Sequence, residues 1–153
     1  MYSNILVPLD GSEPSNNALE HALTIAEKFN SKVSLLAVVA RVILPVFPDE
    51  GFGTAPMTAA KDMARYQEKM KIIYENVLVE AREKITREHP DIELVTLLKE
   101  GRPSATIVQT AEEDGYDLIV MGSRGVGGIT GWILGSTSRR VVDSCTKPIL
   151  IVK

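Results

Sequence analysis

Cysteine and histidine are scarce in this sequence, and their scarcity argues against two kinds of site. Cys145 is the single cysteine among 153 residues, so no internal disulfide can form, which agrees with a reducing compartment. No motif places a base beside Cys145, and we expect a small apolar residue rather than a nucleophile. The two histidines, His21 and His89, have no neighbours at metal-ligand spacing, which argues against a transition-metal site.

Runs of one charge and long apolar runs are also missing. The chain has 17 basic and 20 acidic residues, and no tract of lysine and arginine stands out as a footprint for nucleic acid or anionic lipid. No apolar run approaches membrane-spanning length, and the opening MYSNILVPLD lacks the basic and apolar regions of a signal peptide. We therefore expect a cytoplasmic protein without nucleic-acid or membrane partners.

What the sequence does contain is an alternation of short apolar runs with longer segments of helical period. This alternation is typical of a parallel sheet whose strands are joined by crossover helices. The predicted strands are residues 4–9, 32–40, 92–98, 116–122 and 148–153. The predicted helices are one that follows the cap residue Ser12 and others at about 59–88, 104–113 and 136–144.

The long helix at about 59–88 carries apolar residues at intervals of three and four. Met63, Tyr66 and Met70 belong to this series, and we expect them to face the sheet. The preceding segment, residues 41–58, contains several prolines and glycines and fits neither period. It is predicted to be a long surface loop or lid, because loops of this length are uncommon unless they are functional or disordered.

The bulk composition and the order of elements together predict the location of a binding site. At 44% hydrophobic residues, the chain can bury one sizeable core, which indicates a single domain over residues 1–153. An open, doubly wound parallel sheet binds ligands beyond the carboxyl ends of its strands, where the winding reverses. With strand 4–9 central, the crevice falls between residues 8–11 and 121–125.

Glycine is concentrated at this expected crevice. Six of the 11 glycines lie between Gly122 and Gly135, where exposed backbone amides could approach an anion closely. The hydroxyls of residues 136–138 stand at the start of a predicted helix, whose N-terminus favours phosphate. The pattern is not a P-loop, because no G-x-x-x-x-G-K-[ST] occurs. Taken alone, the segment is either a phosphate cradle or a flexible surface excursion.

The spacing of these glycines resembles the motif of a known family. Gly122, Gly125, Gly135 and Ser136 fit the pattern G-x2-G-x9-G-[ST] of the ATP-binding branch of the universal stress protein family. The resemblance extends over the whole chain, from ILVPLDGSEPS through GRPSATIVQTAEEDGYDLIVMGSRG to TKPILIVK. It implies a Rossmann-like α/β domain with strand order 3-2-1-4-5, an ATP site and a homodimer.

The resemblance also implies which residues contact the nucleotide. These are Pro8, Leu9, Asp10, Val39, Met121, Gly122, Arg124, Gly125, Gly135, Ser136, Thr137 and Ser138. Val39 and Met121 would hold adenine between apolar surfaces. Asp10 would bind the ribose or, through water, a Mg²⁺ that bridges phosphate oxygens. Alternatively, Asp10 only shapes the turn into the first helix.

The phosphate chain would lie on the glycine motif. The amides of Gly125, Gly135 and Ser136 would hold the phosphates, and the hydroxyls of Ser136 and Ser138 would add hydrogen bonds. Arg124 would neutralise phosphate charge as a planar donor, although a solvated loop arginine is the alternative reading. No lysine of the P-loop type is present, so we expect little or slow hydrolysis.

These expectations describe a stress-response regulator or sensor that binds ATP with Mg²⁺. Two other functions stay open: a slow ATPase or other ATP-dependent enzyme, and a stress protein that acts by protein contacts without ATP. The C-terminal run 148–153 would form a sheet edge whose unpaired backbone groups invite a second copy. We therefore expect a homodimer through this strand, together with an unidentified regulatory protein partner.

Overall fold

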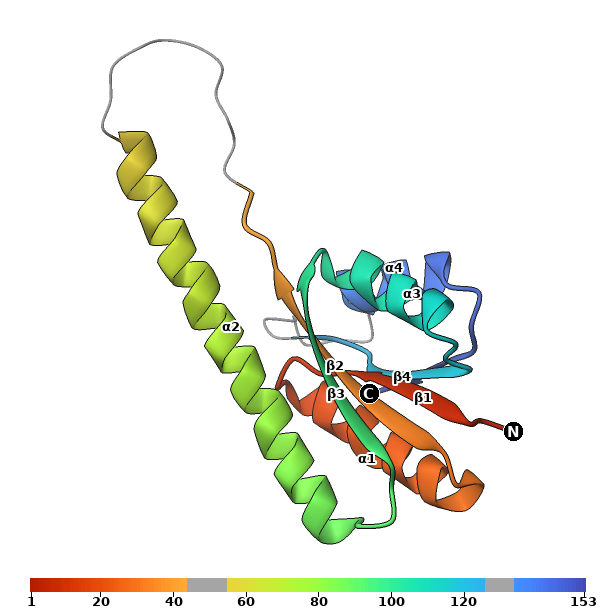
Figure 1. The fold of residues 1–153 in the computed structure, drawn as a ribbon. Helices are drawn as coiled ribbons and strands as arrows, with labels where there is room; N and C mark the ends of the chain where they lie inside the picture. Colours follow the sequence, from red (N-terminus) through yellow and green to blue (C-terminus); the bar gives the residue numbers. More distant parts are fainter. Residues whose placement is uncertain (44–54, 126–133) are drawn as a thin grey trace.

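The computed structural model describes residues 1–43, 55–125 and 134–153, in which strands and helices alternate along the chain as predicted (Figure 1). The strands are β1 (Asn4–Pro8), β2 (Lys32–Ala40), β3 (Leu94–Gly101), β4 (Leu118–Gly122) and β5 (Ile149–Val152). The helices are α1 (Glu13–Phe29), α2 (Ala55–Glu88), α3 (Pro103–Glu113) and α4 (Ser136–Ser144). The bounds of β2 and α4 are those predicted, and the other ends differ by a few residues.

The strands form one parallel five-stranded sheet in the order β3-β2-β1-β4-β5. This confirms the predicted α/β architecture and strand order. β1 is central and pairs on one side with β2 and on the other with β4, so that Ile5 lies beside both Val33 and Leu118. The winding therefore reverses between β1 and β4, as predicted, and a crevice is expected beyond their carboxyl ends.

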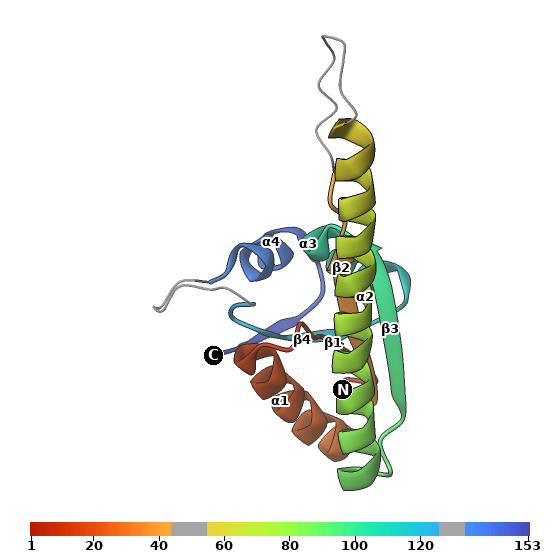
Figure 2. The same cartoon turned by 90° about the vertical axis from the view of Figure 1, so that its left-hand side faces the viewer.

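Helices cover both faces of the sheet, because alternate strand residues point to opposite sides. One core cluster joins α1 and α2 to the face that carries Ile5, Val7 and Leu35. The other joins α3 and α4 to the face that carries Leu6 and Leu36. Figures 1 and 2 show α1 and α2 on one side of the sheet and α3 and α4 on the other.

The residues at the start of α1 cap and begin the helix as predicted from the sequence. Ser12 is the N-cap, and its Oγ accepts a hydrogen bond from the Ser15 amide at 3.4 Å. Pro14 lies in the first turn, where its missing amide is no loss. At the other end Asn30 adopts a left-handed conformation with φ of 54°, which ends the helix.

The helix α2 begins at Ala55, four residues before the predicted start, and extends past the sheet (Figures 1 and 2). Its 34 residues span about 50 Å, whereas the 9 residues of β2 span about 30 Å. Tyr66 was expected to face the sheet but is 53% exposed, because the sheet does not reach that part of the helix. The first buried side chain among the described residues of α2 is Leu78.

Of the predicted loop or lid at residues 41–58, residues 44–54 lie outside the described part of the chain. The structure places its final residues, from Ala55 onward, in α2. Within the described ranges no helix is long and apolar enough to cross a membrane.

Ile85 and Val79 provide a matched pair for testing how α2 is held. Ile85 is 1% exposed and packs in the core, whereas Val79 on the same helix is 51% exposed. We predict that Ile85→Ala lowers the free energy of unfolding by about 2–5 kcal/mol, because it leaves a cavity. Val79→Ala should change it by less than about 0.5 kcal/mol. Urea unfolding followed by circular dichroism measures both, and equal losses would contradict the observed packing of α2.

Candidate functional site

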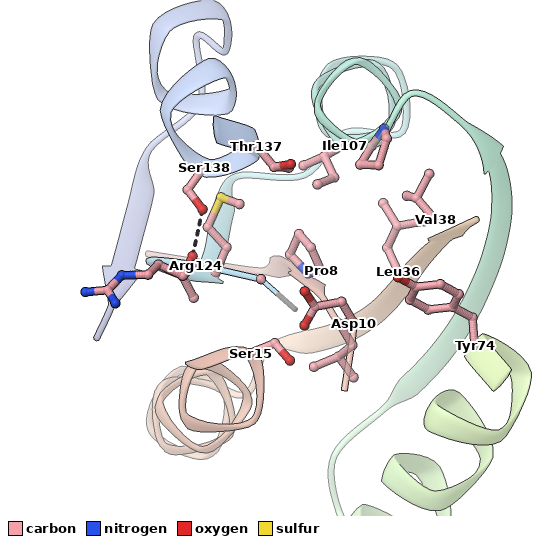
Figure 3. A pocket seen from close by; sticks show the side chains of 15 residues that line it. Pro8, Asp10, Ser15, Leu36, Val38, Tyr74, Ile107, Arg124, Thr137 and Ser138 are labelled. Carbon is pink, nitrogen blue, oxygen red and sulfur yellow. Dashed lines mark hydrogen bonds between the residues drawn. The ribbon is translucent and has the colours of Figure 1, made fainter. Parts of the chain in front are cut away.

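A cavity of about 230 Å³ opens at the carboxyl ends of β1 and β4, where the winding reverses. Nine of the residues predicted for the site line it: Pro8, Leu9, Asp10, Met121, Gly122, Arg124, Gly125, Thr137 and Ser138. They come from the ends of β1 and β4 and from the first turn of α4, which are separated in sequence but adjacent in the fold. The cavity therefore lies where the sequence predicted a ligand (Figure 3).

Asp10 follows β1 and both shapes a turn and lines the cavity. Its Oδ1 accepts hydrogen bonds from the Ser12 amide at 3.0 Å and from the Ser12 hydroxyl at 2.5 Å. The next residue, Gly11, has φ of +80°, a conformation that side chains disfavour. The turn-shaping role left open by the sequence is thus present, and the carboxylate still faces the cavity (Figure 3).

Gly122 and Gly125 are closely packed at the end of β4. A Cβ atom on Gly122 would lie 2.7 Å from the backbone carbon of Pro14 and 2.8 Å from the Ser15 nitrogen, because α1 begins directly against this point. A Cβ on Gly125 would overlap Oδ2 of Asp10. The start of α1 excludes a side chain at Gly122, and a side chain at Gly125 would displace the Asp10 carboxylate. Both positions thus have a steric reason for glycine that does not depend on a ligand.

The N-terminus of α4 stands at the cavity without a side-chain cap. Gly135 is the N-cap residue, and its amide donates to the Ser123 carbonyl at 2.8 Å. The first α-helical bond of α4 is donated by Arg139, so the amides of the preceding turn have no intrahelical acceptor. No described side chain caps them. These amides and the helix dipole make this end of the cavity favourable for an anion.

Ser138 lines the cavity and also makes a hydrogen bond that the sequence did not indicate. Its side chain is 3% exposed and its hydroxyl donates to the Gly122 carbonyl at 2.9 Å (Figure 3). A hydroxyl has one proton to donate, so in this structure it fastens α4 to the end of β4 instead of donating to a ligand. Thr137, which lines the cavity beside it, carries the hydroxyl that remains for such a contact.

Three of the predicted residues do not line the cavity. Val39 is fully buried, but the lining residue is its neighbour Val38, and successive side chains of a strand point to opposite faces. Ser136 is exposed and Gly135 lies behind Arg124, whose Cα would be 3.3 Å from a Cβ on that glycine. The remaining glycines of the cluster, at 127, 128 and 131, lie outside the described residues.

The structure adds lining residues that the sequence did not single out. They are Ser15, Leu36, Val38, Tyr74, Pro103 and Ile107. Leu36 and Val38 could have been found from strand alternation once the face of β2 was known. Pro103 and Ile107 lie in the first turns of α3, after the neighbouring strand β3. Tyr74 lies in the middle of a long helix, and nothing in the sequence shows which turn of that helix reaches the cavity.

The cavity has two chemically different ends (Figure 3). Leu36, Val38 and Tyr74 lie at one end, whereas Arg124 and Thr137 lie at the other. Burial raises the pKa of Tyr74, and the negative charge of Asp10 and the neighbouring Tyr66 raise it further. Tyr74 is therefore neutral at physiological pH and presents an aromatic ring with a hydroxyl donor.

Asp10 is the one carboxylate that lines the cavity among the described residues. No group of three or more histidine, cysteine, aspartate or glutamate side chains suited to a metal ion occurs in the described ranges. A single carboxylate fits a hard cation whose other ligands are water and phosphate oxygens. The residues present thus fit Mg²⁺ carried by a nucleotide better than a metal ion held by the protein alone.

An open parallel α/β sheet with a polarised cavity at its reversal point is characteristic of Rossmann-like binding proteins. The model of the universal stress protein family matches residues 1–153, and the chain belongs to that family. Universal stress protein YxiE of Bacillus subtilis is 31% identical over 154 residues, which cover 100% of both chains.

Two solved structures illustrate the similarity in three dimensions. Universal stress protein UspA from Lactobacillus plantarum has a TM-score of 0.80 at 24% identity, covering 99% of this chain and 98% of that one. At that identity the likeness concerns the fold. A universal stress protein solved in complex with cAMP has a TM-score of 0.62 at 27% identity and covers 99% of this chain and 96% of its own.

The hydrogen bond from Ser138 to Gly122 predicts a difference between two serines of α4. Ser138→Ala should lower the free energy of unfolding by about 1–2 kcal/mol, because it removes a buried hydrogen bond and its donor. Ser136→Ala, at an exposed position two residues earlier, should leave stability within about 0.5 kcal/mol. Urea denaturation compares the two variants, and an unchanged Ser138→Ala midpoint would argue against the contact.

Proposed function

We propose that residues 1–153 act as one ATP-binding domain that serves as a stress-response regulator or sensor. The observation that carries this proposal is the polarised cavity at the β1/β4 reversal, with the uncapped N-terminus of α4 at its polar end. An anionic chain suits one end of this cavity and an apolar base suits the other. The relative solved in complex with cAMP supports an adenine nucleotide as the ligand.

The phosphates would lie at the polar end. The amides at the start of α4 lack acceptors within the helix, and Gly125 contributes backbone to the same wall of the cavity. Thr137 adds a hydroxyl at the same wall. The guanidinium of Arg124 is directed away from the cavity in Figure 3, and it would turn inward to neutralise phosphate charge. These donors come from two places, the end of β4 and the start of α4. A wall with donors from both places suits a chain of phosphates better than a single phosphate.

Magnesium would enter with the nucleotide. When bound, Mg²⁺ would neutralise phosphate charge. Asp10, the carboxylate that lines the cavity, would hold the hydrated ion through a water ligand. Among the described lining residues there is no lysine and no second carboxylate to orient an attacking water. We therefore propose a protein that binds ATP and hydrolyses it slowly or not at all.

The first test combines identification of the ligand with a variant of the phosphate wall. Mass analysis of small molecules released from the denatured protein should detect an adenine nucleotide. In ATP titrations with Mg²⁺, the variant Gly135→Val/Ser136→Val should bind at least about tenfold more weakly than the wild type, because valine side chains restrict the approach of phosphate to the amides.

Ser144→Val is the matched control for that variant, since it places the same side chain at the exposed far end of α4. It should bind ATP like the wild type. Circular dichroism spectra of all three proteins must agree, so that a loss of binding reports on the site. If Gly135→Val/Ser136→Val binds ATP as tightly as the wild type and Ser144→Val do, the phosphates do not lie at the start of α4.

We also propose a homodimer through β5, which forms one edge of the sheet. The carbonyls of Pro148 and Val152 accept hydrogen bonds from the β4 side. The alternate residues Ile149 and Ile151 therefore direct their backbone groups outward, where a second β5 could pair. Such a dimer would give a regulatory protein partner a surface that depends on both copies.

Leu150 tests this interface because it is 36% exposed on the edge strand. Leu150→Lys should shift the protein to a monomer at concentrations where the wild type is a dimer, because the two lysines would repel each other across the symmetric contact. Val79→Lys, at an exposed site on α2, should leave the dimer intact. Sedimentation velocity over a range of concentrations measures this. A monomeric wild type would refute the dimer, and a dimeric Leu150→Lys variant would refute its location.

A further inference from the structure

Tyr74 is the one lining residue contributed by α2 among the described residues of the cavity. It is partly buried and packs against the core cluster that joins α1 and α2 to the sheet. In Figure 3 its ring extends from α2 toward Leu36 and Val38, on the side of the cavity away from Arg124. An aromatic face thus lies at the apolar end of the cavity.

The position of this ring is fixed by a second contact of the same helix. A Cβ on Gly11 would lie 3.1 Å from Cγ2 of Val77, which means that α2 packs closely on the loop after β1 one turn beyond Tyr74. That loop holds Asp10, whose negative charge contributes to the raised pKa of Tyr74. The phenol and the Asp10 carboxylate therefore both lie at the cavity, and the packing of the Val77 side chain on Gly11 holds α2 against the loop that carries Asp10.

The chemistry of this end favours a nucleobase over a phosphate or a sugar. Leu36 and Val38 offer only apolar atoms, and a neutral aromatic ring attracts the π-face of a base by stacking. The donors for phosphate are on the opposite side, at Arg124 and the start of α4. A nucleotide that spans the cavity thus places its base at Tyr74.

We propose that Tyr74 is a specificity-determining residue of the site, whose ring packs against the base of the bound nucleotide and favours purines over pyrimidines. This inference rests on the proposed nucleotide-binding function. Purines gain more from the ring than pyrimidines do, because their π-surface is larger. The hydroxyl, which faces Asp10, is of secondary importance to this preference.

The test measures ATP and CTP affinities, in the presence of Mg²⁺, for the wild type and for Tyr74→Ala, Tyr74→Phe and Tyr74→Leu. Tyr74→Ala should weaken ATP binding by about tenfold, the effect of losing one stacked base. CTP should lose less, so that the ratio of the two affinities falls. Tyr74→Phe should keep the wild-type ratio, and Tyr74→Leu should resemble Tyr74→Ala.

Tyr66→Ala is the matched control, because Tyr66 lies on the same helix two turns earlier, is 53% exposed and does not line the cavity. It should bind ATP like the wild type. An unchanged ATP to CTP ratio in Tyr74→Ala would overturn the inference, as would a ratio lost in Tyr74→Phe. If the wild type binds neither nucleotide, the proposed function itself fails; if it binds ATP and only the ratio test fails, that function stands without a role for Tyr74.

Discussion

The packing at Gly122, the last residue of β4, is the constraint on which the rest of the site depends. The start of α1 lies so close to this residue that no side chain fits, and the Ser138 hydroxyl joins the start of α4 to its carbonyl. Two helix N-termini therefore meet at the carboxyl end of one central strand. In α1 the Ser15 amide donates to the Ser12 side chain, whereas the N-cap of α4, Gly135, makes no side-chain cap hydrogen bond.

The second constraint is the way α2 lies across the sheet. Its C-terminal half is anchored by Leu78 and Ile85, and its middle reaches the loop after β1 through Val77. The part before Tyr74 has no buried side chain among those described. The same helix therefore combines a firmly packed segment, a segment that forms the cavity wall and a segment that projects beyond the body of the molecule (Figure 2).

The architecture could be predicted from the sequence because its signals are local and repeated. The bounds of β2 follow from an apolar run between Lys32 and Ala40 that only Ser34 interrupts, and Ser12 and Pro14 mark the start of α1. Strand order then placed the crevice at the β1/β4 reversal. Most of the predicted site residues line the cavity, because the ends of strands are fixed by the fold.

The parts that could not be predicted depend on side-chain orientation and on the relative lengths of elements. Val38 and not Val39 faces the cavity, a choice that follows from the register of β2 and not from composition. The partner of the Ser138 hydroxyl is 16 positions away in sequence, so no local pattern indicates it. Tyr66 has the right period for a core position but lies where the sheet has ended.

The pairing of β1 with β4 has a consequence for how the molecule folds. It joins Ile5 to Leu118, so the chain between them must close into a large loop before the crevice exists. Contacts of such long sequence separation form slowly compared with local helices. We therefore expect the cavity to form late in folding, and a ligand that bound there would stabilise the folded state relative to the unfolded chain.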